Sequence, residues 1–309
     1  MIFDPNHFLG RVDTLVHQTL DADRWKHVPY VQDSFSPPAL ARRLHRAGGK
    51  RIRPLLVYHG MTMAHLRDEY DLDRGVRLAA AVELLHLFGL LQDDIMDDAS
   101  LRRGMPTAAP FVLDELGLRA SEHPAARRHA NSIAILAGDL CAALANEMVA
   151  SEHPAIRRVW AELCSEMVLG QYADVVATVT GESDPDLLRR IASLKSGRYS
   201  IHLPLSLGVL VVDHDQDLTE LAQACETLGV AFQLADDMRD HQHSVTSGKD
   251  QHLDAANGRI TYADMFTGTS QSIQRSIEAA VAMLRNVGFD DRRLDDLQTL
   301  FCGVITTAA

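Results

Sequence analysis

The residues with the clearest chemical potential are two aspartate clusters of identical spacing. The pattern D-D-x-x-D occurs twice, beginning at Asp93 and at Asp236. In an α-helix the first and fifth positions lie one turn apart on one face, so Asp93 faces Asp97 and Asp236 faces Asp240. Carboxylates repel at this distance unless a cation joins them, and oxygen-only clusters suit Mg²⁺ shared with substrate phosphates. A solvated acidic helix end is the alternative for either motif taken alone.

Basic side chains accompany the aspartates as three closely spaced pairs. Guanidinium groups and helix N-termini are natural ligands of diphosphates. Each pair taken alone favours surface charge over a ligand, but beside two metal-type clusters the pairs indicate a phosphorylated substrate. The pairs are Lys50 and Arg53, Arg102 and Arg103, and Lys195 and Arg198.

A histidine accompanies the first aspartate motif. His86 precedes Asp93 by seven residues, which is nearly two helical turns, so the two side chains share a stripe of the same helix. A histidine in an apolar helix is either a core residue or a ligand, and both readings fit His86.

The segments that carry these residues have the apolar periodicity of helices. The segment Val76–Leu91 is apolar on almost every side, as is typical of a helix inside a large helical protein. Leu207–Val212 could form a strand, but one such run makes no sheet. No linker has a Pro, Gly or Ser bias, so residues 1–309 are expected to form one all-α domain. Helices are predicted over Ile52–Leu66, Val76–Leu91, Ser132–Ala150, Ala155–Val179, Pro185–Ser196, Leu218–Arg239, Ser270–Asn286 and Asp290–Ile305.

Composition excludes several classes of protein. The chain has 30 Lys and Arg against 42 Asp and Glu, a net charge of -12, which argues against a nucleic-acid-binding surface. No unbroken apolar run approaches the ~20 residues that span a bilayer. None of the four cysteines belongs to a C-x-x-C pair, so neither a disulfide framework nor a zinc-thiolate site is expected. These features predict a cytoplasmic protein without a membrane span.

Five motifs occur in an order that resembles a known family. GGKRIRP, ELLHLFGLLQDDIMDDASLRRG, GQYADV, KSGRY and FQLADDMRD follow one another between about residues 48 and 261. The sequence resembles the trans-isoprenyl diphosphate synthases of the polyprenyl synthetase family, of the short-chain geranylgeranyl or farnesyl type. The resemblance implies an isoprenoid synthase-like helical bundle around a deep central cavity, in a homodimer. It also implies Mg²⁺-dependent, head-to-tail condensation of isopentenyl diphosphate with dimethylallyl, geranyl or farnesyl diphosphate.

The resemblance further implies roles for individual residues. Three Mg²⁺ ions would join the allylic diphosphate to the two motifs. Their ligands would be Asp93, Asp97 and Asp236, supported by Asp94, Asp237 and Asp240. Isopentenyl diphosphate would bind Lys50, Arg53, His86 and Arg103. The allylic diphosphate would bind Arg102, Lys195, Ser196, Gln233 and Lys249, with Arg259 as a further cation. Catalysis would depend most on Asp93, Asp97, Arg102, Lys195 and Asp236.

Some positions depart from the family pattern. Gln92 replaces a histidine that often precedes the first motif, and Ser196 stands where threonine is usual. The segment 250–257 is unusual and has histidines nearby, which are compatible with a solvated loop or with a transition-metal site. Because of these departures, the sequence does not establish how the allylic diphosphate site is closed.

Product length is expected to depend on the helix below Asp93. Gly89 precedes Asp93 by four residues and therefore lies about 6 Å deeper on the same stripe, where its missing side chain leaves room. In the family, a bulky residue at the position of Phe88 acts as a floor. This arrangement predicts a product of twenty carbons, with fifteen as the alternative, although Phe88 is equally compatible with ordinary core packing.

Three other functions compete with this reading. A class I terpene cyclase would not need GGK-x-x-R, the Arg102–Arg103 pair or His86, and all are present. A non-catalytic partner subunit of a prenyl synthase would be favoured by the loss of an aspartate motif, and neither motif is lost. A helical metal phosphohydrolase would need a His-Asp pair on a helix, but His214-Asp215 lies in a polar segment.

Overall fold

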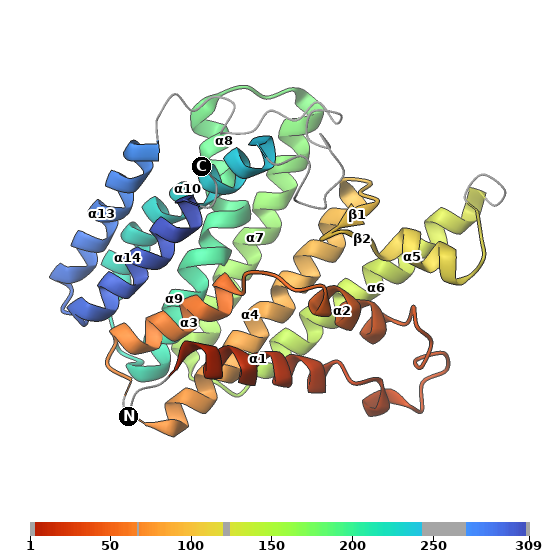
Figure 1. Cartoon of the computed structure of the whole chain (residues 1–309), viewed down its shortest axis with the longest axis horizontal. Coiled ribbons are helices and arrows are strands. Elements are labelled where there is room, and N and C mark those ends of the chain that lie inside the picture. Colours follow the sequence, from red (N-terminus) through yellow and green to blue (C-terminus); the bar gives the residue numbers. More distant parts are fainter. Residues whose placement is uncertain (1–3, 67, 120–123, 243–269, 307–309) are drawn as a thin grey trace. The chain divides into compact units, whose positions relative to one another are not determined.

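The chain is all-α, as its sequence predicts (Figure 1). The computed structural model describes residues 4–66, 68–119, 124–242 and 270–306. The helices are α1 (Pro5–Thr19), η1 (Ala22–Trp25), α2 (Pro37–Arg46), α3 (Ile52–Met63), α4 (Glu69–Met96), α5 (Ala108–Glu115), α6 (Pro124–Val149), α7 (Pro154–Thr180), α8 (Pro185–Ala192), η2 (Ser193–His202), α9 (Leu203–Val212), α10 (Thr219–Gln242), α13 (Ser270–Asn286) and α14 (Asp291–Thr306). Two short strands, β1 (Leu101–Arg102) and β2 (Met105–Pro106), pair as an antiparallel hairpin.

The described residues divide into two compact units. The first contains residues 4–51 and 80–150, and the second contains residues 52–79, 151–242 and 270–306, apart from the undescribed positions inside these ranges. Helix α4 begins in the second unit and ends, without a break, in the first. The single domain expected from the sequence therefore stays a prediction, and each unit is described by itself.

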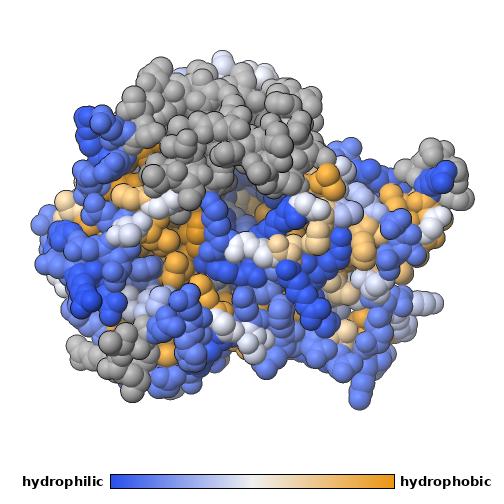
Figure 2. Space-filling view, viewed as in Figure 1, coloured by the Kyte–Doolittle hydropathy of each residue, from blue (hydrophilic) through white to orange (hydrophobic). Residues whose placement is uncertain are grey.

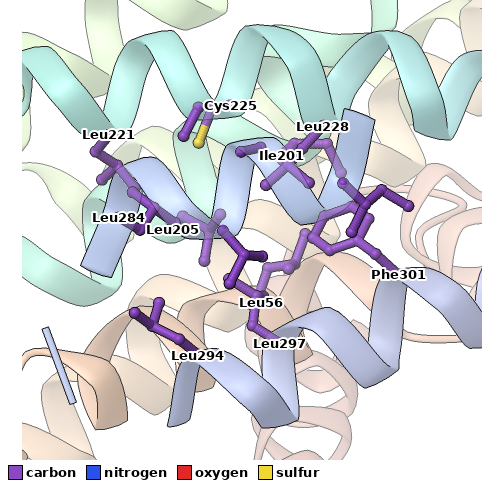
Figure 3. Close-up of a cluster of buried hydrophobic side chains, with 14 of the residues drawn as sticks. Leu56, Ile201, Leu205, Leu221, Cys225, Leu228, Leu284, Leu294, Leu297 and Phe301 are labelled. Carbon is purple, nitrogen blue, oxygen red and sulfur yellow. The ribbon is translucent and has the colours of Figure 1, made fainter. Parts of the chain in front are cut away.

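The second unit has an apolar core between α3, α9, α10, α13 and α14 (Figure 3). Leu56, Leu205, Leu228 and Phe301 are among its most deeply buried side chains. Residues 203–211 of α9 are all buried, which explains why this apolar run reads like a buried strand. The strand alternative for Leu207–Val212 is wrong, because the segment is helical.

Two glycines allow α3 and α9 to approach closely. A Cβ atom on Gly60 would lie 2.4 Å from the carbonyl oxygen of Leu205, and one on Gly208 would lie 2.2 Å from that of Val57. Real Cβ atoms do not come so near to backbone oxygen atoms. The two helices must therefore separate if either position acquires a side chain.

The variant Gly208→Ala is expected to lower the free energy of unfolding by about 1–3 kcal/mol, because overpacking here strains backbone rather than a movable side chain. Gly10→Ala is the matched control. Gly10 also lies in a helix, but its Cβ would meet nothing within 4 Å, so better helix propensity should leave stability equal or slightly higher. Thermal unfolding of both variants measures the difference, and equal melting temperatures would show that the contact does not constrain the two helices.

The first unit contains α6 and the second half of α4. Helices α2 and α5 pack against α6. Small buried residues, such as Ala134, Ala137 and Ala145, allow this close helix packing. Helix α1 starts at Pro5, directly after Asp4, whose carboxylate accepts hydrogen bonds from the backbone amides of Asn6 and His7.

The structure also bears on the expectations for cysteine and for membrane spans. In the described residues none of the four cysteines forms a disulfide. Within the part of the chain that the structure describes, Glu69–Met96 and Ala125–Val149 are long and apolar enough to cross a membrane, although neither is an unbroken apolar run. The apolar window of the first is 67% buried and that of the second 39%, and core helices of soluble proteins meet the same criterion. Polar residues cover much of the face in Figure 2.

Candidate functional site

The first aspartate motif spans the end of α4, with Asp97 one residue beyond its last residue, Met96. The amide of Asp97 donates to the carbonyl of Asp93 at 2.8 Å, so the helical register continues through the motif. Both of these side chains are half-buried, and they share one face of the helix as predicted. Asp98, with φ of 52°, then ends the helix. Two oxygen-bearing side chains on an accessible helix face fit a divalent ion whose coordination a substrate completes.

The middle aspartate of the motif has a different environment. Asp94 is buried, and its Oδ1 accepts from Nε of Arg102 at 2.5 Å. Burial raises the pKa of Asp94 to about 6, while the nearby guanidinium acts in the opposite direction. Asp94 stays a predicted supporting ligand, but in this structure its carboxylate holds an arginine.

The arginine pair lies on the hairpin that follows the motif. Leu101 pairs with Pro106 and Arg102 pairs with Met105, which leaves Arg103 and Gly104 as the two turn residues. Their φ angles are 52° and 73°, the left-handed values that a two-residue type I′ turn requires. The hairpin therefore places two guanidinium groups directly after the aspartates, one of them held by Asp94.

Arg103 joins the hairpin to the glycine loop, which we define as residues 48–51. Its guanidinium donates to the carbonyl oxygens of Leu44, at 3.3 Å, and of Gly48. It also lies so close to Gly49 that a Cβ there would stand 2.9 Å from Nη2. The exposed Lys50 is the next residue of this loop. The structure thus brings together two of the cations predicted to bind isopentenyl diphosphate.

The remaining site residues of the first unit lie on α4. His86 and Gly89 are partly exposed, as Asp93 is, and the helical register puts all three on one stripe. A Cβ on Gly89 would meet nothing within 4 Å, so open space lies beside it, as expected. Phe88 is half-buried and lies about 100° around the helix from Gly89.

In the second unit, Arg53 is held by two consecutive residues of η2. Its Nη2 donates to the hydroxyl oxygens of Tyr199, at 2.9 Å, and Ser200, at 2.8 Å, and its Nε donates to Ser200 at 3.1 Å. The guanidinium also stacks over the Tyr199 ring, 4.8 Å from the centroid. Sequence reasoning found Arg53 but missed Tyr199 and Ser200, because nothing in the sequence pairs residues nearly 150 positions apart.

Lys195 lies on the same π-helical segment. Its Nζ forms an ion pair of 2.8 Å with Asp174 of α7, which belongs to the GQYADV motif. The absence of a side chain at Gly170 allows α7 to approach η2 closely, since a Cβ there would lie only 2.4 Å from the amide nitrogen of Lys195. The segment was expected to continue α8 as an α-helix to Ser196, but α8 ends at Ala192 and a π-helix follows. The π-helix spans ten residues, whereas π-helical geometry mostly occurs as single-turn bulges, frequently at functional sites.

The second aspartate motif lies in α10. The helix is continuous to Gln242, so its backbone register gives Asp236 and Asp240 a common face. The side chains of Ser196, Gln233, Asp236, Asp237 and Asp240 lie outside the described part of the structure, as do Lys249, Arg259 and the whole segment 250–257. Their predicted roles stay predictions.

Comparisons with known proteins agree with this set of motifs. Residues 38–288 match the polyprenyl synthetase family. A farnesyl diphosphate synthase of Geobacillus stearothermophilus is 30% identical over 287 residues, covering 86% of this chain and 88% of that protein. A nonaprenyl diphosphate synthase of Mycobacterium tuberculosis is 29% identical over 244 residues, covering 79% of this chain and 65% of that protein. These relatives are named for products of different lengths.

A solved structure gives the same result for the fold. The geranylgeranyl pyrophosphate synthase of Corynebacterium glutamicum, complexed with isoprenyl diphosphate and magnesium, matches with a TM-score of 0.81 at 23% identity. The match covers 98% of this chain and 99% of that chain. The fold is therefore that of the isoprenoid synthases. With the match over residues 38–288, it follows that the chain belongs to the polyprenyl synthetase family, a family of prenyltransferases.

Proposed function

We propose that the chain condenses isopentenyl diphosphate head-to-tail with an allylic diphosphate in a Mg²⁺-dependent reaction. The observation that carries the proposal is the accessible face shared by Asp93 and Asp97, followed at once by a hairpin with two arginines. Dimethylallyl, geranyl and farnesyl diphosphate are the candidate allylic substrates. Membership of the polyprenyl synthetase family supports the reaction class.

Divalent metal fits the residues at the end of α4. Carboxylate oxygens are the ligands that Mg²⁺ prefers, and it usually binds a few of them together with substrate phosphates. Asp93 and Asp97 would hold two ions and Asp236 a third, with Asp94, Asp237 and Asp240 in support. When bound, the metal supplies Lewis-acid stabilisation of the departing diphosphate.

The protein's own side chains bind and orient the two substrates. Lys50, Arg53, His86 and Arg103 hold isopentenyl diphosphate. Arg102 and Lys195 lie against the allylic diphosphate, where their positive charge stabilises the negative charge that develops on its bridging oxygen. Ser196, Gln233, Lys249 and Arg259 support the allylic side.

The chemistry needs no side-chain nucleophile. The allylic C–O bond breaks and leaves a delocalised cation, and apolar walls exclude the water that would quench it. The double bond of isopentenyl diphosphate attacks the cation and forms the new C–C bond. The released diphosphate then takes a proton from the new carbocation, so the products are a prenyl diphosphate five carbons longer and protonated diphosphate.

One assay tests the proposal directly. The purified chain is incubated with each allylic diphosphate, with and without isopentenyl diphosphate and Mg²⁺. We expect elongated all-trans products only when all three components are present. A cyclic or linear hydrocarbon formed without isopentenyl diphosphate would indicate a terpene cyclase instead. No product under any condition would indicate a non-catalytic subunit.

We propose a short product, of twenty carbons with fifteen as the alternative, because Phe88 would close the space beside Gly89. Phe88→Ala is then expected to lengthen the product by one or more five-carbon units, since the growing chain passes the vacated position. Phe88→Tyr keeps the bulk and should keep the wild-type length. Conversely, Gly89→Leu should shorten the product. Chromatography of the dephosphorylated products measures all three, and an unchanged length in Phe88→Ala would show that Phe88 is not the floor.

We also propose that the protein is a cytoplasmic homodimer. Helix α7 carries a stripe of exposed apolar residues at helical spacing, which a second copy would cover. Its most exposed members are Val168 (53%), Leu169 (63%), Tyr172 (68%) and Val179 (82%). Sedimentation of the purified protein at several concentrations measures the oligomeric state, and a monomer at all of them would contradict the proposal. Recovery in the membrane fraction after lysis would contradict the location.

A further inference from the structure

Arg51, the last residue of the glycine loop, donates hydrogen bonds to three different residues. Its Nε donates to Oδ1 of Asp13 at 2.9 Å, and its Nη1 donates to Oε1 of Glu83 at 2.7 Å. Its Nη2 donates to the carbonyl oxygen of His45 at 2.9 Å. One guanidinium therefore connects α1, α4 and the end of α2, all within the first unit.

Glu83 is the unusual member of this network. Its side chain is 2% exposed, and it lies on α4 one turn before His86 and in the same helix as Asp93. A buried carboxylate is destabilising unless it is paired. His45 also approaches Glu83, at 3.9 Å, but burial and the neighbouring Arg51 lower the pKa of His45 to about 3, so it is neutral near pH 7. Arg51 therefore supplies the positive charge that Glu83 requires.

The backbone at Arg51 is held in a conformation that this pairing stabilises. Its φ of 49° is left-handed, a conformation that is unfavourable for a residue with a side chain. Gly48 and Gly49 also have positive φ angles, of 87° and 145°. Three of the four residues of the glycine loop are thus in left-handed conformations, and local preference alone does not select this shape. The charge-assisted hydrogen bonds of Arg51 to a rigid helix fix it.

The shape of the loop determines where two substrate-binding cations lie. Lys50 precedes Arg51 directly, so its direction follows the backbone of the loop. Arg103 donates to the carbonyl of Gly48 and packs on Gly49, so its guanidinium follows the same backbone. His86 lies on the helix that carries Glu83, one turn further along.

We propose that Arg51 and Glu83 are positioning residues for isopentenyl diphosphate. Their ion pair fixes the glycine loop to α4 and so sets the spacing between Lys50 and Arg103 on the loop side and His86 on the helix. Neither residue touches substrate. The proposal rests on the proposed condensation reaction. It adds that the Arg51–Glu83 ion pair maintains the geometry of the isopentenyl diphosphate site.

The test compares Glu83→Gln with the wild-type enzyme. The amide keeps the volume and one acceptor oxygen but removes the charge. We expect the KM for isopentenyl diphosphate to rise about tenfold, equivalent to about 1.4 kcal/mol, while the KM for the allylic substrate and kcat change by less than about threefold. Asp13→Asn removes a more exposed partner of Arg51 and should shift the same KM by a smaller factor. Asp13→Asn replaces Glu83→Gln as the test variant if Glu83→Gln does not fold.

A matched control separates positioning from general stability. Arg24→Gln breaks another Arg–Glu ion pair of the first unit, with Glu147, whose side chains are 42% and 58% exposed. It should leave both KM values unchanged. Amide hydrogen exchange of residues 48–51 should be faster in Glu83→Gln and unchanged in Arg24→Gln.

The outcomes distinguish this proposal from the proposed function. If wild-type enzyme does not condense isopentenyl diphosphate, the proposed function fails and the positioning role falls with it, while hydrogen exchange still reports whether Glu83 orders the loop. If wild-type enzyme is active and Glu83→Gln lowers only the melting temperature, with an unchanged KM for isopentenyl diphosphate, the pair is merely structural and the proposal is wrong. Equal increases in both KM values would also overturn it.

Discussion

Replacement of Asp93 by asparagine is expected to lower kcat by about a thousandfold, equivalent to about 4 kcal/mol of lost transition-state stabilisation. Asp93 faces Asp97 across one turn, and both side chains are accessible. A neutral amide binds Mg²⁺ more weakly than a carboxylate, so the departing diphosphate would lose the cation that stabilises it. Steady-state kinetics with saturating substrates measures the effect. Excess chelator should abolish wild-type activity, and added Mg²⁺ should restore it.

Asp98→Asn is the matched control for this prediction. Asp98 lies five residues after Asp93, but its side chain is 79% exposed and pairs with Arg127. Asparagine tolerates the left-handed backbone of this position, so the same charge is removed without a change of fold. We expect kcat to change by less than about threefold, because an exposed ion pair contributes little. Equal losses in both variants would mean that net charge, rather than a metal site, explains the effect. Full activity in excess chelator would contradict metal dependence altogether.

The elements that position the first motif could be predicted because their signals are local. The apolar stretch before Asp93 requires a buried helix, and α4 is that helix, although it begins earlier and ends later than Val76–Leu91. The D-D-x-x-D spacing alone defines the shared face of Asp93 and Asp97. Pro154 and Gly181 bracket α7 at its start and its end, as helix signals do.

Other features depend on tertiary contacts and have no local signal. The sequence predicts that a helix continues from Pro185 to Ser196, yet Ser193–His202 forms a π-helix. It packs against α7 at Gly170, and Gly197 approaches Gly229 of α10, where an added Cβ would meet backbone at 3.2 Å. The π-helical geometry of η2 therefore occurs where it packs closely against both α7 and α10. Similarly, Arg51 and Glu83 are separated by 32 positions, and no spacing rule relates them.

The sequence contains a local signal for the turn of the hairpin that follows the first motif. Arg103-Gly104 has the residue-glycine form of a type I′ turn, and both φ angles are positive. The strands are only two residues long, too short for an alternating pattern to indicate them. In this case the arginines were identified by chemistry, whereas the turn that presents them became evident only from the structure.

The second large effect is expected for Arg53→Ala, which should raise the KM for isopentenyl diphosphate by about 30–100-fold. Hydrogen bonds to charged groups contribute about 1.5–3 kcal/mol, and a net loss of about 2–3 kcal/mol corresponds to this factor. The hydroxyl of buried Ser200 and the ring of Tyr199 hold Arg53 in place before substrate arrives. Alanine removes a preorganised ligand, so the loss should appear in substrate binding more than in kcat. Initial rates with one substrate varied at a time measure both KM values.

Two further variants decide whether charge or geometry carries the effect. Arg53→Lys keeps the charge but lacks the planar fork that meets both Ser200 and Tyr199, so it should recover only part of the affinity. Arg190→Ala removes an exposed arginine of α8 in the same unit and should leave both KM values unchanged. If Arg53→Ala raises the allylic KM as much as that of isopentenyl diphosphate, Arg53 does not distinguish the two substrates. The cations of the GGK-x-x-R motif would then belong to both diphosphate sites rather than to one.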